Sequence, residues 1–262
     1  MAGDRESFLG LGPGTGRGWL ESLLSVLFPG RCLFCRAILP FSRLEPFCPA
    51  CRRHYRPGGR ICPFCEGFFR EQAPCSCRPD DSPLQGLFVI ALYDQGWRRL
   101  IHDLKYRNRR SVFRPLGAWL AAEIVNSRYC RPDLVAPVPL HPRREKERGY
   151  NQGALLARHT ARALGVPCRS LLAREKHTRS QTAISRLERQ ENVRGVFRAL
   201  EADHGGATVL LIDDVYSTGS TMKEAAAALQ ARGAKVFGAA LAYNPGPRIL
   251  QRSGFYGGLE QW

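Results

Sequence analysis

The sequence predicts an α/β protein, in which a parallel sheet is flanked by helices and a small cysteine-rich domain comes first. Apolar runs of strand length alternate with longer runs of helical composition between residues 87 and 241, which is the pattern of such a sheet. The four apolar residues from Val209 to Ile212 are typical of a strand buried on both faces. Eight of the ten cysteines lie before residue 80, mostly in C-x-x-C pairs, and this concentration marks the first domain.

The composition allows a substantial core and favours anionic partners. A chain of 262 residues with 44% apolar content suits one large or two modest domains. Lys and Arg number 39 against 23 Asp and Glu, which gives a net charge of +16. Such an excess favours nucleic acid, phosphorylated substrates or an anionic membrane surface. An arginine-rich genome would also raise the charge, so charge alone does not choose among these partners.

The first 27 residues are expected to form a disordered and partly helical lead-in. The run from Trp19 to Phe28 fits a short amphipathic helix, and it contains Glu21 and is far too short to span a membrane. The charged residues near the start do not fit a signal peptide. We therefore expect a cytoplasmic protein without a transmembrane segment, in which thiols stay reduced.

The cysteine-rich segment, residues 28–80, is predicted to hold two structural Zn²⁺ ions. Its ligand candidates form four closely spaced pairs: Cys32 and Cys35, Cys48 and Cys51, Cys62 and Cys65, Cys75 and Cys77. Eight thiolates fill two tetrahedral sites, and closed Cys₄ coordination leaves no open position for catalysis. A redox role would not need four pairs. We expect sequential pairs to share a metal, with crossed pairing as the alternative, and a domain that depends on metal for folding.

The next segment, from residue 81, supplies two strands and three helices before a long polar stretch. The expected strands are residues 87–93 and 134–139, and the expected helices are residues 97–106, 115–127 and 154–164. The loop from His141 to Gly153 carries Arg143, Arg144 and Arg148, whose guanidinium groups suit bidentate recognition of phosphate oxygens. The basic run from Lys105 to Arg110 is typical of a solvated face, which is the ordinary interpretation.

Residues 174–198 form a polar and basic stretch that includes Arg179. A mobile loop that closes on a substrate would have this composition, and so would a plain connector; its length and charge favour the mobile loop. One further strand is expected over residues 235–241, and the Gly- and Pro-rich tail, residues 245–262, is expected to be loose.

Two carboxylates and a hydroxyl-rich loop follow the central strand, and an alanine-rich helix is expected over residues 223–232. The candidate ligand-binding residues are Asp213, Asp214, Tyr216, Ser217, Thr218, Gly219, Ser220 and Thr221. Ligands bind at the carboxyl ends of strands in open α/β sheets. Hydroxyls with backbone N–H groups at a helix N-terminus make a phosphate cradle, for which Gly219 can adopt a positive φ. Acidic acceptors beside that cradle suit a sugar phosphate. A Walker B strand is excluded, because no G-x-x-x-x-G-K-[ST] loop exists.

This stretch resembles the phosphoribosyl diphosphate (PRPP) signature of type I phosphoribosyltransferases, in which the acidic pair grips the ribose hydroxyls and the loop binds the 5′-phosphate. Together with the eight cysteines and the V-P-L-x-x-x-R…R-G-Y-N-Q and Q-x-x-x-x-R-L…N-V-x-G-V-F segments, it resembles the ComF/GntX family of predicted amidophosphoribosyltransferases. The resemblance implies a double zinc ribbon over residues 28–80 and a type I phosphoribosyltransferase-like sheet over residues 81–244.

The resemblance also implies roles for the loops and partners for the protein. Residues 138–151 match the family's pyrophosphate loop and residues 181–197 its flexible loop, so Arg143, Arg144, Arg148 and Arg179 become the candidate catalytic residues, with Mg²⁺ bound alongside PRPP. Family members are linked to DNA uptake, which makes single-stranded DNA or a competence helicase a candidate partner. We expect a phosphoribosyltransferase of unknown acceptor; the alternative is a non-catalytic PRPP-sensing or single-stranded DNA-binding competence protein.

Overall fold

The computed structural model describes residues 31–39, 47–53, 57–65, 68–69, 77, 82–127, 129–175, 195–200 and 203–245. The predicted lead-in, nearly all of the predicted tail, Cys75 and Arg179 lie outside these residues. Every strand and helix that the sequence predicts between residues 87 and 241 is present.

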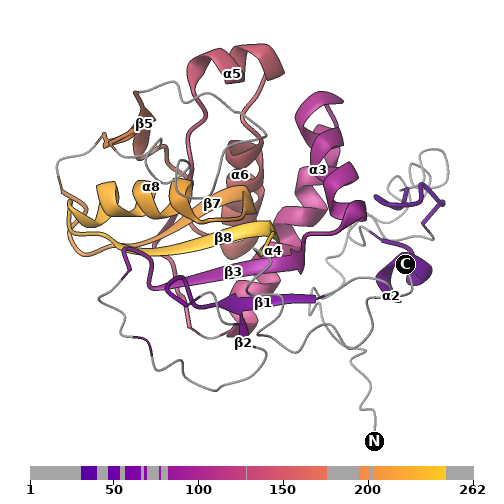
Figure 1. The fold of residues 1–262 in the computed structure, drawn as a ribbon, viewed down its shortest axis with the longest axis horizontal. Helices are drawn as coiled ribbons and strands as arrows, with labels where there is room; N and C mark the ends of the chain where they lie inside the picture. The colour runs from indigo at the N-terminus through magenta and orange to yellow at the C-terminus, as the bar shows by residue number, and fades with distance from the viewer. Residues whose placement is uncertain are drawn as a thin grey trace, which may run out of the picture.

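A six-stranded sheet in the order β2-β1-β3-β8-β7-β4 forms the centre of the molecule (Figure 1). Its strands are β1 (Pro57–Ile61), β2 (Phe68–Phe69), β3 (Gly86–Leu92), β4 (Leu134–Pro137), β7 (Thr208–Tyr216) and β8 (Lys235–Tyr243). The strands β3, β8, β7 and β4 are mutually parallel, so their carboxyl ends meet at one edge. β4 stands last in the strand order, where its terminal proline removes no ladder bond that the sheet needs.

Helices cover both faces of this sheet, as Figure 1 shows for α8 on the near face and α4 on the far one. The helices are α2 (Pro49–Arg53), α3 (Gln95–Tyr106), α4 (Phe113–Ser127), α5 (Pro142–Arg148), α6 (Gln152–Leu164) and α8 (Ser220–Gln230), with a 3₁₀ turn η2 (Arg110–Val112). Within β7, Leu210 and Ile212 belong to the apolar cluster on the α4–α6 side, whereas Val209 and Leu211 belong to the cluster on the α8 side. This alternation confirms the predicted burial of the strand on both faces.

Local sequence explains where α3 and α6 begin and end. The Asp94 side chain accepts a hydrogen bond from the Trp97 N–H at 2.9 Å and caps α3, whose buried side chains recur with helical spacing from Trp97 to Leu104. Asn151 caps α6 through the Ala154 N–H at 3.2 Å. The helix α6 ends at Gly165, which has a φ of 73°.

Three local features differ from the sequence-based expectation. The carboxylates of Asp213 and Asp214 lie inside β7 rather than after it, because pairing with β8 continues to Tyr216. The loop between β4 and α6 contains α5, which the charged sequence without an apolar period did not indicate. Two short strands, β5 (Leu172–Arg174) and β6 (Phe197–Ala199), pair antiparallel at the two ends of the predicted mobile loop, whose middle lies outside the described residues.

The cysteine-rich segment is continuous with the main sheet and its core. β1 pairs antiparallel with β3, from Pro57 opposite Ala91 to Ile61 opposite Leu87. The apolar cluster that includes α3 and α4 also includes Cys32 and Cys48. The predicted domain limits at residues 28, 80 and 244 stay a prediction. One apolar cluster contains residues from both sides of the limit at residue 80. No helix in the described part of the chain has the length and apolarity to cross a membrane.

Candidate functional site

The acidic pair lies near the carboxyl end of β7 and is met there by a lysine. The Lys105 Nζ atom, in the last turn of α3, lies 2.7 Å from Asp214 Oδ2. The Asp214 backbone N–H donates to Asp213 Oδ1 at 2.8 Å. Only 24% of the Lys105 side chain and 15% of the Asp214 side chain are exposed, so this ion pair is weakly screened by water. The two carboxylates therefore share one compensating cation.

Burial and neighbouring charges shift the pKa values of Asp213 and Lys105. Desolvation and the neighbouring Asp214 charge raise the pKa of Asp213 to about 7, although the Asp214 N–H and Lys105 oppose the shift. Burial alone would lower the pKa of Lys105, but Asp214 and Asp213 outweigh it and the pKa is raised. Lys105 is thus a permanent cation at neutral pH, while Asp213 can exchange a proton there.

Arginines from two elements surround the acidic pair. The Arg148 charge acts on Lys105, and the Arg148 guanidinium lies 5.5 Å from the Tyr106 ring. On β5, burial lowers the pKa of Arg174 and the Arg144 charge adds to this effect, while Asp213 opposes it. Arg144, Arg148 and Arg174 therefore lie within electrostatic range of the site. Arg143 instead pairs with Glu147 at 3.1 Å, and both of these side chains are exposed on α5.

The loop that carries Arg148 is tied to both α3 and α6. The Tyr150 hydroxyl donates to the Leu104 carbonyl, next to Lys105. Arg148 Nη1 donates to Gln152 Oε1 at 3.1 Å, and Gln152 Nε2 is buried without a hydrogen-bond partner among the described residues. A buried donor of this kind is satisfied by an ordered water or by a ligand oxygen.

The hydroxyl-rich loop opens the N-terminus of α8. Gly219 has a φ of 72°, which confirms the expected positive φ. The Thr218 and Ser220 hydroxyl oxygens lie 2.7 Å apart, and the Thr218 hydroxyl accepts a hydrogen bond from the Ser220 N–H at 3.4 Å. The positive end of the helix dipole, with these hydroxyls beside it, can receive an anion. The Tyr216 side chain is only 1% exposed, so it packs inside the protein under the loop and has almost no surface with which to contact a ligand.

Cysteine thiols gather in two sequential groups. The first cysteine cluster is Cys32, Cys35, Cys48 and Cys51, and the second is Cys62, Cys65 and Cys77; within each, all Sγ atoms lie within 4.8 Å of one another. The Cys35 and Cys48 Sγ atoms are 3.6 Å apart, close to the ~3.8 Å edge of a ZnS₄ tetrahedron with Zn–S bonds of about 2.3 Å. The grouping is sequential, so the crossed alternative is excluded for the described cysteines.

The first cluster has the electrostatics of a cation site. Burial opposes ionisation of Cys32, but backbone N–H groups of Cys35, Cys48 and Phe34 lower its pKa to about 7. Burial and the neighbouring sulfur atoms raise the pKa of Cys51. The Cys51 N–H points at Cys48 Sγ at 3.4 Å, as backbone amides do in metal knuckles. Four thiols at this spacing fit Zn²⁺, which would stabilise all four as thiolates.

Sequence reasoning did not assign Lys105 or Arg174 to the site. Lys105 stood in a basic run that resembles any solvated face, yet it follows Trp97 and Ile101 at four-residue spacing. That spacing places it on the buried face of α3, and it is the signal that could have identified it. Arg174 offered no such signal, because its position depends on β5 pairing with β6.

Comparison with known proteins places the chain in a family. A family model described as "Phosphoribosyl transferase domain" matches residues 151–260. The DNA utilization protein YhgH of Escherichia coli (strain K12) is 33% identical over 213 residues, which cover 79% of this chain and 93% of the relative. Competence protein ComFC of Bacillus subtilis (strain 168) is 28% identical over 236 residues, covering 77% and 89%. The chain belongs to the ComF family.

A further relative and one solved structure are also similar to this chain. Competence protein F of Haemophilus influenzae is 27% identical over 215 residues, which cover 79% of this chain and 93% of the relative. A glutamine PRPP amidotransferase from B. subtilis, complexed with ADP and GMP, is 22% identical over 53% of this chain and 30% of that one, with a TM-score of 0.35. A TM-score this low supports no inference about the site of the ComF-family chain.

Proposed function

We propose that this ComF-family protein is a PRPP-dependent phosphoribosyltransferase. In this proposal Asp213 and Asp214 accept hydrogen bonds from the ribose hydroxyls, and the N-terminus of α8 binds the 5′-phosphate. The observation that supports it best is the Lys105–Asp214 ion pair of 2.7 Å at the carboxyl edge of the sheet. It orients one carboxylate, and the adjoining N-terminus of α8, with the Thr218 and Ser220 hydroxyls beside it, suits a phosphate.

The arginines around the pair suit a diphosphate leaving group. Displacement at the anomeric carbon needs no side-chain nucleophile, since its main demand is stabilisation of the charge that grows on pyrophosphate. Arg174 lies within electrostatic range of Asp213, Arg148 lies within range of Lys105, and Arg144 lies within range of Arg174, so these three arginines can supply that stabilisation. Arg143 would reach a diphosphate only by leaving Glu147. Arg179 remains a candidate outside the described residues.

Magnesium fits the same site, because carboxylate oxygens are the hard ligands that it prefers. Asp213 and Asp214 would hold Mg²⁺ together with oxygens of the substrate. When bound, Mg²⁺ would neutralise charge on the diphosphate. Within the protein, Lys105 orients the Asp214 carboxylate, and the unpaired Gln152 Nε2 can donate to a ligand oxygen.

Binding of PRPP to an Asp213→Asn, Asp214→Asn double variant tests the site. Loss of two charged acceptors should weaken binding by about 1–3 kcal/mol for each group, measured by calorimetry with Mg²⁺ present. Asp133→Asn is the matched control, because Asp133 lies at the amino-terminal end of β7 and accepts from the Thr208 N–H at 2.7 Å. Wild-type affinity in the double variant would contradict the assignment.

A second candidate function is PRPP sensing or single-stranded DNA binding without turnover. It is favoured by the names of the relatives, which refer to DNA utilization and competence, and by the net charge of +16. Release of pyrophosphate from PRPP in the presence of candidate amines supports the enzyme, whereas PRPP binding without release supports the sensor. DNA binding by this charge should weaken steeply as salt rises, because phosphate contacts release counterions.

A further inference from the structure

We propose that Lys105 is a positioning residue for Asp214 and that the first cysteine cluster fixes its place by bracing α3. The inference rests on the proposed function, because it concerns the same sugar-phosphate site. It connects two parts of the molecule that the sequence presents as separate domains. A metal ion held by the cluster would then act on the acidic pair through one helix.

The helix α3 reaches from the cluster to the acidic pair. Lys105 follows Trp97 by eight residues, or about 12 Å along a helix. Trp97 is fully buried near the start of α3, and Lys105 meets Asp214 in its last turn. Because a helix of this length is rigid, displacement of its first turns moves the Lys105 ammonium relative to β7.

Aromatic side chains next to the ligand cysteines pack on α3 and α4. The Phe34 ring meets the Trp97 ring edge to face, with centroids 5.7 Å apart. The Phe47 ring lies 6.0 Å from Trp97 and 5.5 Å from Trp119. Phe34 precedes Cys35, and Phe47 precedes Cys48, so the positions of both rings depend on the geometry of the cluster. Such edge-to-face pairs are favourable beyond the burial of their surface.

An ion pair joins the cluster to the same helix nearer the site. Arg36, directly after Cys35, donates from Nη2 to Asp103 Oδ2 at 2.8 Å. Arg107 and Arg109 also reach Asp103, at 3.3 and 3.5 Å. Arg36 has a φ of 66°, a conformation that non-glycine residues hold only where their surroundings impose it. Asp103 lies two residues before Lys105, so this contact fixes the turn that carries the lysine.

Lys105 makes the contact that positions the acidic pair. The cations near the pair are Lys105, Arg148 and Arg174. Among the described residues, Lys105 is the cation that contacts Asp214 directly, with its Nζ atom 2.7 Å from Asp214 Oδ2. Without this contact the Asp214 carboxylate loses the partner that holds its orientation, and its repulsion with Asp213 is no longer offset at close range. A misoriented carboxylate accepts hydrogen bonds from the ribose hydroxyls less well.

Removal of the metal tests whether the first cysteine cluster holds α3 in place, and the exchange measurement does not depend on PRPP binding. After a zinc chelator and transfer into Mg²⁺ buffer, hydrogen exchange in residues 95–106 should accelerate, and PRPP binding should weaken. Added Zn²⁺ should reverse both effects. Unchanged protection of α3 in metal-free protein would overturn the brace. If the zinc-loaded wild type failed to bind PRPP, the proposed function would fail, and the exchange result would still decide the brace.

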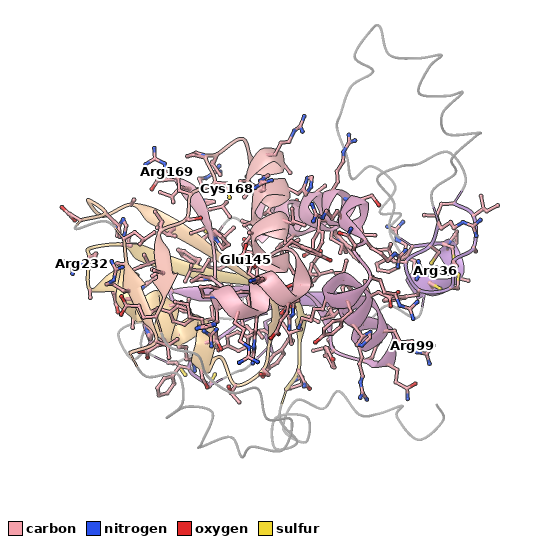
Figure 2. All side chains as sticks on the ribbon, turned by 90° about the horizontal axis from the view of Figure 1, so that it is seen from above. Arg36, Arg99, Glu145, Cys168, Arg169 and Arg232 are labelled. Carbon is pink, nitrogen blue, oxygen red and sulfur yellow. The ribbon has the colours of Figure 1, made fainter. Side chains whose placement is uncertain are left out.

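Single substitutions test the two ends of α3. Lys105→Met should weaken PRPP binding about 10- to 100-fold, since a hydrogen bond to a charged group is lost. Lys105→Arg should restore part of the affinity, because it replaces the cation at the same position. Arg36→Ala should weaken binding and speed exchange in α3, whereas Arg99→Ala, which removes the same charge from an exposed position on α3, should do neither (Figure 2). Wild-type binding in Lys105→Met, or equal effects of Arg36→Ala and Arg99→Ala, would overturn the proposal.

Discussion

At Gly219 the chain enters α8 with a φ of 72°, and the Tyr216 side chain occupies the place that a Cβ atom would need. Glycine is required at position 219 for two independent reasons. The positive φ is strained for a residue with a Cβ atom, and Tyr216 already fills the space that a Cβ atom would take. The fully buried Tyr216 cannot move aside, because its ring packs against Tyr243 with centroids 5.9 Å apart. The shape of the loop between β7 and α8 therefore depends on the absence of one methyl group.

Gly219→Ala should lower the free energy of unfolding by about 2–4 kcal/mol, the sum of left-handed strain and overpacking. Gly165→Ala is the control, because Gly165 has a φ of 73° with no atom within 4 Å of a built Cβ. It should cost only about 1–2 kcal/mol, from the strain alone. Chemical denaturation measures both variants, and equal losses would show that Tyr216 can yield.

Asp213 makes stability depend on pH in a defined direction. Its pKa of about 7 in the folded protein exceeds the ~4 of an unfolded aspartate. The folded state therefore binds this proton more tightly. The stabilising contribution is complete below about pH 4 and is lost as the pH rises through about 7.

Asp213→Asn should remove this part of the pH dependence. Between pH 5 and pH 8 the wild type should lose on the order of 1–3 kcal/mol of unfolding free energy that the variant keeps. Urea denaturation at both pH values gives the comparison, with Asp203→Asn in an exposed turn as the control. Parallel pH curves for wild type and Asp213→Asn would rule out the raised pKa.

Among the elements, α4 and α6 make the closest helix pair in the layer that supports the acidic strand. They cross at Gly117, where a Cβ atom would lie 2.6 Å from His159 Cβ and 2.9 Å from the His159 carbonyl carbon. The helix α6 also packs on β4 and β7. Close approach at this glycine therefore sets how far α6 lies from the strand that carries Asp213 and Asp214.

Gly117→Ala should destabilise the protein by about 1–3 kcal/mol through overpacking, even though alanine favours a helix by about 1 kcal/mol over glycine. His159→Ala should not rescue it, because the obstructing atoms include the backbone of residue 159. Chemical denaturation of the single and double variants measures their free energies of unfolding. If the double variant regained the stability that Gly117→Ala loses, the steric clash would be with the imidazole ring and not with the backbone.

At the scale of the whole molecule, the cysteine-rich segment and the parallel sheet form one structure. β1 extends the sheet beside β3, and Cys32 and Cys48 lie in the same apolar cluster as α3 and α4. From the sequence we expected a small domain that depends on metal for folding, and that expectation did not include this shared core. Metal binding should therefore stabilise more of the chain than the segment that holds the ligands.

Metal analysis of the purified protein should find about two zinc ions per chain, one for the four thiols of the first cysteine cluster and one for the second cluster, whose predicted fourth ligand, Cys75, lies outside the described residues. Unfolding of the zinc-loaded protein should be a single transition, and a chelator should lower its midpoint. Calorimetry with and without the chelator measures the number of transitions and their midpoints. A separate low-temperature transition that alone responds to the chelator would show that the cysteine-rich segment unfolds independently.

The sequence by itself determined the four parallel strands, the helices α3, α4, α6 and α8, the acidic pair followed by a hydroxyl-rich loop, and the cysteine pairs. These features depend on periodicity and spacing over one or two turns of chain, which local physics governs. The tertiary structure alone decided that Lys105 meets Asp214, that Arg36 meets Asp103 and that β1 joins β3. Such contacts join residues far apart in the chain, and they exist only because the packing of whole elements brings them together.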